Sequence, residues 1–160
     1  MTGETLVRGQ KVPEGLFHLV CEVLVRHRDG SFLAMRRDRK KSGFPGWWET
    51  TAGGSALKGE DRWQCAHREL REETGIEAGF FQQIGCEVWP ETHCIHISFL
   101  CTVDCGKDSI ILQPGETEDY RWMSEQEFIE FVNSEHMIPS QKRRLRTWLR
   151  EMGYWKGAKI

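Results

Sequence analysis

Hydrophobic and polar positions alternate along several stretches of this chain, and this period of two predicts β-strands. The longest stretch begins at residue 16 with the sequence LFHLVCEVLVR, and a polar turn at residues 28–31 leads from it into FLAMRR at 32–37. Two strands joined by so short a turn predict a hairpin. Further strands are expected at residues 47–52, 80–89, 94–103 and 109–113. Together they indicate a central sheet.

Three other stretches carry apolar residues three or four positions apart, which is the spacing of an amphipathic helix. The first runs from Glu60 to a stop signal at Gly75, the second covers 125–133, and the third covers 140–152 with Ser140 as its predicted cap. Since helices alternate with strands along the chain, they are expected on both faces of a mixed β-sheet. The predicted fold class is therefore α/β.

Length and composition limit what this sheet can carry. With 160 residues, of which 39% are hydrophobic, the chain fits a single domain over residues 1–160. No apolar run approaches the roughly 18 residues that span a membrane, so a soluble protein without a membrane partner is expected. A net charge of −2 gives no overall attraction for nucleic acid, and small phosphorylated molecules are the expected ligands.

The six cysteines include no CxxC pair, and the first 15 residues lack the apolar core of a signal peptide. Both features favour a reducing, cytoplasmic location. Free thiols in apolar strands behave as small hydrophobic groups, so no cysteine is assigned a role. The sequence leaves the oligomeric state open, and a homodimer is one of the alternatives.

The clearest chemistry lies in residues 54–76, GSALKGEDRWQCAHRELREETGI. On the predicted helix, Glu69, Glu72 and Glu73 are related as i, i+3 and i+4 and therefore share one edge. The adjacent apolar face carries Trp63, Ala66, Leu70 and Thr74. Three carboxylates beside an apolar face repel one another and need a compensating cation. Their oxygen atoms suit Mg²⁺, and the alternative is a solvated face neutralised by nearby arginines.

The fixed positions of this stretch are Gly54, Glu60, the run from Arg68 to Glu73, and Gly75 followed by an aliphatic residue. At every specified position the stretch resembles the signature of the Nudix hydrolases. The resemblance implies the α/β/α sandwich of that fold, with a central mixed β-sheet. It also implies hydrolysis of a phosphoanhydride bond in a nucleoside diphosphate linked to another moiety. The implied substrate is a small molecule, and the implied cofactor is Mg²⁺, with Mn²⁺ as its alternative.

The resemblance also implies roles for individual residues. The metal ligands would be Glu69, Glu72, Glu73 and the carbonyl oxygen of Gly54. Arg68, adjacent to Glu69, would orient a carboxylate through bidentate hydrogen bonds, a geometry that lysine matches poorly. Glu69 is also a candidate for the base that activates water.

Other residues near the signature are expected to contact substrate. Gly53 and Gly54 lack side chains and would let the backbone approach a phosphate, with a plain tight turn as the alternative. Arg37 ends a predicted strand where many Nudix enzymes place a phosphate-contacting arginine. Candidates for stacking on a base, with a place in the core as the alternative, are Phe44, Trp47 and Trp48.

A second acidic cluster, GETEDYRW at residues 115–122, follows the last predicted strand. Glu116 and Glu118 point to the same side of an extended chain and would face one cleft. In the family, a glutamate a few residues before a tryptophan often serves as an additional metal ligand or as the base. Glu116 stands six residues before Trp122 and fits this role best. A solvated acidic loop is the alternative.

Other suggestive groups have simpler explanations. His93 and His96 point to opposite faces of a predicted strand, so they cannot bind one metal ion without a bulge. The basic residues at 142–150 spread around a helix whose other side is apolar, and a solvated face is expected. Glu60 is expected to be structural, because nine residues of helix place it opposite Glu69.

Two other functions fit part of the pattern. Isopentenyl-diphosphate isomerases share the fold, but Gly53 and Ser55 stand here where their catalytic cysteine and histidine would be. A non-catalytic nucleotide-binding module is the other alternative, and in this family such modules usually have a damaged signature. The intact signature favours an enzyme.

Overall fold

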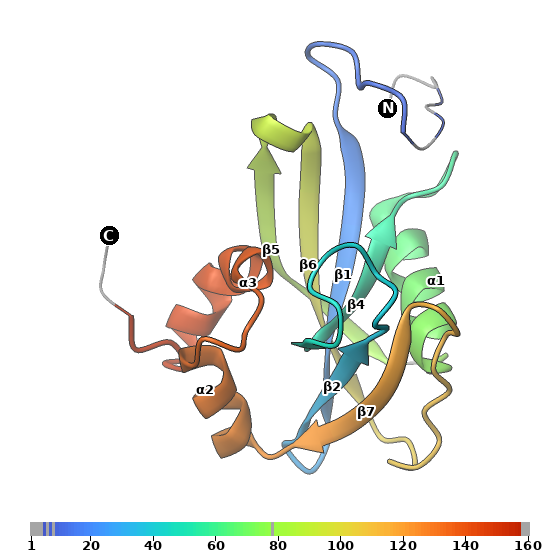
Figure 1. The fold of residues 1–160 in the computed structure, drawn as a ribbon. Helices are drawn as coiled ribbons and strands as arrows, with labels where there is room; N and C mark the ends of the chain where they lie inside the picture. The colour runs from blue at the N-terminus through green and yellow to red at the C-terminus, as the bar shows by residue number, and fades with distance from the viewer. Residues whose placement is uncertain (1–4, 6, 8, 78, 158–160) are drawn as a thin grey trace.

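The computed structural model describes residues 5, 7, 9–77 and 79–157. In this part of the chain, one mixed sheet contains β1 (His18–His27), β2 (Phe32–Arg37), β3 (Trp48–Glu49), β4 (Thr51–Ser55), β5 (Phe80–Trp89), β6 (Cys94–Val103) and β7 (Thr117–Met123). The helices are α1 (Arg62–Thr74), α2 (Glu125–Asn133) and α3 (Pro139–Glu151), and a 3₁₀ turn, η1, spans Pro90–Thr92. Helix α1 covers one face of the sheet, and α2 and α3 cover the other (Figure 1). The expected α/β/α sandwich is confirmed.

The sheet has the order β3-β2-β1-β6-β5, with β4 also paired to β1 and β7 to β2. Strands β1 and β6 run parallel, whereas the other pairs are antiparallel. The first half of β1 pairs with β4 from Val20 to Leu24, and its end pairs with β2 through Arg26 and Phe32. The sheet therefore divides. On one side of the division β4 pairs with β1, and on the other side β3 pairs with the end of β2. We call the space between these two pairs of strands the fork.

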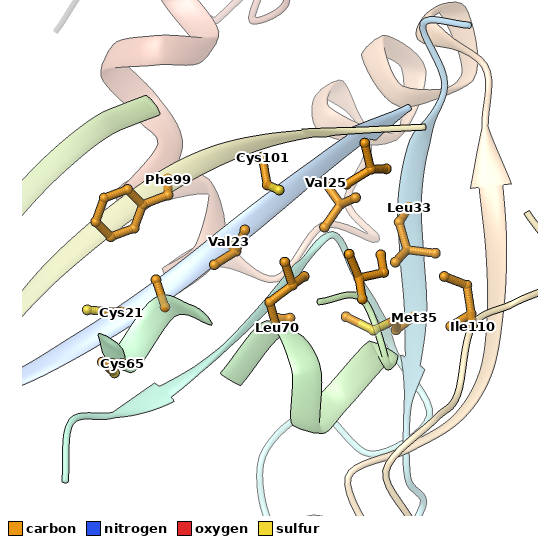
Figure 2. Packing of buried hydrophobic residues seen from close by; sticks show 14 of the residues in the cluster. Cys21, Val23, Val25, Leu33, Met35, Cys65, Leu70, Phe99, Cys101 and Ile110 are labelled. Carbon is orange, nitrogen blue, oxygen red and sulfur yellow. The ribbon is translucent and has the colours of Figure 1, made fainter. Parts of the chain in front are cut away.

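Two apolar clusters hold the helices on the sheet. The cluster under α1 includes Val23, Leu70 and Phe99, and Figure 2 shows Leu70 lying among the side chains of the strands. In the cluster under α2 and α3, the rings of Phe32 and Phe128 stack with their centres 4.1 Å apart. Burying each such side chain contributes about 1.5–3 kcal/mol, so these contacts fix the helices in place.

Four predicted elements are confirmed with the bounds expected for them, namely β2, β5, β6 and α2. The strand expected at 47–52 is instead two short strands, because Thr50 between them directs its amide and hydroxyl to Oε1 of Gln141 at 3.2 Å. The prediction of a strand at 109–113 is wrong. Ile110 is buried in the cluster under α1, and the amide of Ile111 donates to the carbonyl of Thr74 at the end of α1.

The starts of two helices also differ from prediction. Helix α1 begins at Arg62 rather than Glu60, because Asp61 caps it and accepts from two amides of the first turn at 2.8 and 2.9 Å. Helix α3 begins at Pro139, and the predicted cap is wrong because Ser140 already lies inside the first turn. No helix in the described ranges is both long and apolar enough to cross a membrane.

Replacing Asp61 with alanine tests the cap that sets the start of α1. The change removes the acceptor of two amides and should lower the free energy of unfolding of the metal-free protein by about 1 kcal/mol. Urea denaturation followed by tryptophan fluorescence measures this loss. Asp108→Ala is the matched control, because it removes the same charge from an exposed turn. Equal stability of Asp61→Ala and the wild-type protein would contradict the assignment of the cap.

Candidate active site

Arg68, near the middle of α1, is the cation around which the acidic residues of this helix are arranged. Its Nε and Nη2 atoms donate to the two carboxylate oxygens of Glu60 at 2.7 and 2.9 Å. Its Nη1 atom donates to Glu69 at 2.7 Å and to Glu72 at 3.1 Å. Nη2 also donates to the carbonyl of Ser55 at 3.1 Å. One guanidinium thus ties α1 to the end of β4 and to the loop before the helix.

The position of Glu60 differs from the prediction, which put it on the helix opposite Glu69. Because α1 begins after Asp61, Glu60 lies in the preceding loop and its carboxylate folds back onto Arg68. The carboxylate that Arg68 binds through two parallel hydrogen bonds is therefore that of Glu60, whereas Glu69 receives a single bond from Nη1. Hydrogen bonds to Glu60 and Glu69 raise the pKa of Arg68 and keep it charged.

Glu69 is buried directly against the backbone of Gly54. A Cβ atom on Gly54 would lie 2.5 Å from Oε1 of Glu69, so only glycine leaves room for this carboxylate. Burial raises the pKa of Glu69, and hydrogen bonding to Arg68 opposes the rise. Gly53 is constrained more strictly, because its Cβ atom would lie 2.3 Å from a backbone carbonyl oxygen of β1. The backbone of β1 therefore requires glycine at position 53, and glycine at position 54 leaves the Glu69 carboxylate its present place.

Glu73, one turn beyond Glu69, is also buried, and its pKa is raised to about 8. Burial is the largest cause, the charges of Glu49 and Glu69 add to it, and the amide of Gly53 acts in the opposite direction. Burial also raises the pKa of Glu49, against the effect of its neighbour Arg37. An additional positive charge at this place would therefore be stabilising.

The glutamates of the predicted metal site lie in different settings. Glu69 and Glu73 are buried, whereas 41% of the Glu72 side chain is exposed. Among the residues that the structure describes, no three side chains of His, Cys, Asp or Glu converge as they would around a bound ion, and Glu69 and Glu72 both contact Arg68. The donor set nevertheless fits a hard divalent cation, since it consists of carboxylate oxygens and the carbonyl of Gly54, and burial raises the pKa of both Glu69 and Glu73.

A cavity of about 130 Å³ opens in the fork next to these acids. Its charged lining comes from separate parts of the chain and consists of Glu22, Glu49, Glu73, Arg37, Lys41 and Arg144. The backbone at Gly53 forms part of the same wall. The volume is smaller than that of a pocket enclosing a whole ligand, so the cavity suits one charged group of a larger molecule.

Arg37 lines this cavity and is held from two sides. Its Nη1 atom donates to both oxygens of Glu49 at 3.2 and 3.0 Å, and its Nε atom donates to the carbonyl of Gly43 at 2.9 Å. The loop after β2 also closes on its backbone, since the amide of Gly46 donates to the Arg37 carbonyl and the Arg37 amide donates to the carbonyl of Trp47. The guanidinium is therefore fixed at the cavity wall.

Glu116 lies in the turn before β7 and reaches the site indirectly. Its carboxylate forms an ion pair with Lys41, which lines the cavity, and its carbonyl accepts from the amide of Asp38 at 2.9 Å. Glu118 binds a different cation, Arg36 on β2, at 3.0 Å. The two acids expected to face one cleft thus have separate partners, and Glu116 is the one connected to the cavity through Lys41.

The charged lining of the cavity includes Glu22, Glu49 and Arg144, for which the sequence predicted no part in the site. Glu22, on β1, is 4% exposed and accepts a hydrogen bond from Nε of Arg144 at 2.7 Å. The expectation that the basic residues of α3 form a solvated face is therefore wrong for Arg144. A charged residue inside the apolar run LVCEVLV was the signal that could have indicated a buried partner.

The aromatic candidates for base stacking differ in accessibility. Trp48 is half-buried, and the guanidinium of Arg121 lies 4.6 Å from its ring centre. Phe44 and Trp47 are 39% and 37% exposed, and their rings contact each other edge to face. Of the three, Phe44 and Trp47 therefore keep surface that a ligand ring can contact.

Comparison with known sequences agrees with this geometry. Residues 16–149 match the model of the NUDIX domain. An uncharacterized Nudix hydrolase from Listeria monocytogenes is 32% identical over 139 residues, which are 87% of this chain and 82% of the relative. A protein from Pseudomonas entomophila named NAD-capped RNA hydrolase NudC is 37% identical over 75 residues, which are 47% of this chain and 26% of that protein.

A solved structure leads to the same family. The MutT protein from Methanosarcina mazei Go1 superposes on this chain with a TM-score of 0.66 and 25% identity, covering 88% of this chain and 99% of its own. The matched residues 16–149 contain the whole signature, including the buried Glu69 and Glu73 and the constrained Gly54. The chain therefore belongs to the Nudix family, and it is a Nudix pyrophosphohydrolase.

Proposed function

We propose that this enzyme uses a divalent cation to hydrolyse a phosphoanhydride bond in a nucleoside diphosphate linked to another moiety. The observation that carries the proposal is the burial of Glu73 beside Glu49 and Glu69, which raises its pKa to about 8. A bound cation would offset this repulsion. Mg²⁺ is the proposed ion and Mn²⁺ its alternative, and the proposed ligands are Glu69, Glu72, Glu73 and the Gly54 carbonyl.

The chain's own residues would position the reactants. Bound at these ligands, the cation would neutralise the diphosphate and activate the attacking water. Arg68 would hold Glu69 in place through its Nη1 bond, and Glu69 is a candidate to accept the proton of that water. Arg37, fixed against Glu49, would bind a phosphoryl oxygen in the cavity. Gly53 would present its backbone to the same group.

Glu116 is proposed to complete the site from a separate loop, as an additional metal ligand or as the base. Its ion pair with Lys41 supports the proposal, because Lys41 lines the cavity and also lowers the pKa of Glu73. A diphosphate entering the cavity would compete for Lys41 and release the Glu116 carboxylate. This exchange would couple substrate binding to the placement of Glu116.

A substrate panel tests the proposed reaction. One relative is named an NAD-capped RNA hydrolase, so NAD and NAD-capped RNA belong in the panel beside nucleotides, nucleotide sugars, dinucleoside polyphosphates and CoA esters. With Mg²⁺, at least one compound should release phosphate or a nucleoside monophosphate, and excess EDTA should abolish the release. Undiminished turnover in EDTA would contradict the metal requirement. Binding without turnover would indicate a nucleotide-binding module instead.

Replacing a proposed metal ligand with glutamine tests its contribution to turnover. Glu72→Gln and Glu73→Gln should each lower turnover by roughly 10²-fold or more, because a charged ligand is lost. Steady-state kinetics on a substrate from the panel measures the effect. Glu77→Gln is the matched control, since it removes an exposed glutamate just beyond α1. Wild-type turnover in both variants would show that these glutamates are not ligands.

The stability of Glu73→Gln should depend on pH in a defined direction. The folded protein keeps a proton on Glu73 up to about pH 8, whereas the unfolded chain loses it near the ordinary pKa of 4.5. The stability contributed by this group is therefore full below pH 4.5 and falls as the pH rises toward 8. Without metal, Glu73→Gln should melt at a higher temperature than the wild-type protein at pH 8, and the difference should shrink toward pH 5. A lower melting temperature at pH 8 would contradict the raised pKa.

Glu116 and Glu118 form a matched pair for testing the contribution from the loop. Glu116→Gln should lower kcat by about 10- to 10³-fold with a smaller change in KM, because a ligand or base acts mainly in the transition state. Glu118→Gln should have less effect, since Glu118 neutralises Arg36. Steady-state kinetics at saturating Mg²⁺ measures both variants. A wild-type rate for Glu116→Gln beside a severe loss for Glu118→Gln would move the assignment to Glu118, and wild-type rates for both would confine the catalytic carboxylates to α1.

A further inference from the structure

Arg144 differs from the other basic residues of α3 in where it points. Arg143 lies over the ring of Trp89, 4.1 Å from its centre, and forms an ion pair with Glu91 at 2.7 Å. Arg146 pairs with Glu87 at 3.6 Å. The guanidinium of Arg144 lies 5.9 Å from the centre of the Trp89 ring, but it pairs with Glu22 on β1 and lines the cavity in the fork. Helix α3 thus places one cation beside acids that belong to α1 and β3.

Glu22 fixes the orientation of Arg144. The Nε atom of Arg144 donates to Oε2 of Glu22 at 2.7 Å, and Oε1 accepts from the hydroxyl of Ser98 at 2.7 Å. The hydroxyl of Thr51 donates to the same Oε2 atom at 3.3 Å and accepts from Nε2 of Gln141 at 2.8 Å. Since Gln141 and Arg144 both belong to α3, this helix is attached to the fork at two points.

The attachment leaves the far edge of the guanidinium available. In the described part of the chain, the side chain of Arg144 donates hydrogen bonds from Nε alone, and 19% of this side chain is exposed. Its Nη1 and Nη2 atoms are the two donors that suit the oxygens of a phosphate. The wall of the cavity that Arg144 lines also contains Arg37 and Lys41, so three separate segments place cations there, beside the carboxylates of Glu22, Glu49 and Glu73.

We propose that Arg144 is a substrate-binding residue, which donates from Nη1 and Nη2 to a phosphoryl group held between Arg37 and Lys41. Helix α3 is then part of the binding site, and Glu22 is the positioning residue that aims the arginine. The identity of the ligand as a diphosphate rests on the proposed function. The binding of an anion by Arg144 is a separate property and can be tested without hydrolysis.

The main difficulty for a test is that Arg144 also neutralises the buried Glu22. Arg144→Met alone should lower the melting temperature, because it leaves a carboxylate without its cation in the sheet. The double variant Glu22→Gln/Arg144→Met removes both charges, and its glutamine can still bond Ser98 and Thr51. The double variant should therefore regain most of the lost melting temperature.

Isothermal titration calorimetry, in EDTA and again in Mg²⁺, measures the affinity for imidodiphosphate. This diphosphate analogue has no P–O–P bond to be cleaved. Arg144→Met and the double variant should both bind about 10-fold or more weakly than the wild-type protein. Arg144→Lys should recover little of the loss, because an ammonium cannot pair with Glu22 and present two parallel donors. Arg146→Met should bind within about two-fold of wild type, since Arg146 pairs with Glu87 on β5.

Three results would overturn the proposal. Wild-type affinity in the double variant would show that Arg144 acts only by neutralising Glu22. Wild-type affinity in Arg144→Met would remove it from the site altogether, and absence of binding by the wild-type protein under both conditions would remove the anion site. If the substrate panel gives no turnover while imidodiphosphate binding still depends on Arg144, the proposed hydrolysis fails and the binding role stands.

Discussion

The arrangement of this site depends on one interaction, the contact of the Arg68 guanidinium with Glu60, Glu69 and Glu72. A carboxylate buried as Glu69 is would be strongly disfavoured without a cation in contact with it. The same guanidinium bonds the carbonyl of Ser55, so it also fixes the end of β4 against α1. Lysine has a single nitrogen and could not make these contacts together. The closeness of the glycine backbone to the glutamates therefore follows from Arg68.

The fork shows the opposite situation, in which charges are buried and incompletely neutralised. Burial raises the pKa of Glu49 and brings that of Glu73 to about 8, even though Arg37 and Lys41 are close by. Such an arrangement costs stability in the free protein, and a cation that binds there can recover that free energy. The division of the sheet makes the arrangement feasible, because β2 leaves β1 after one paired position and opens a cavity between them.

Local patterns predicted much of the fold. The alternation at 80–89 and 94–103 and the helical period at 125–133 gave the bounds of β5, β6 and α2, because each segment buries one face of a regular element. Prediction was wrong where a distant residue decided the outcome. Thr50 interrupts the expected strand because its amide donates a hydrogen bond to the side chain of Gln141. Residues 109–113 lie against the end of α1 rather than in the sheet.

The sequence by itself determined that Glu69, Glu72 and Glu73 share one edge of α1, because their spacing is a local property of a short segment, whereas the need for glycine at position 53 comes from the pairing of β4 with β1. The sequence also predicted that Arg68 would bind a carboxylate through two hydrogen bonds, although not which carboxylate this would be. Only the tertiary structure decided that Glu22 meets Arg144, since these residues are 122 positions apart and the apolar run around Glu22 indicates a buried partner without indicating which one. The physical reason is that helical spacing is set by the backbone, whereas a contact between β1 and α3 is set by how the whole chain packs.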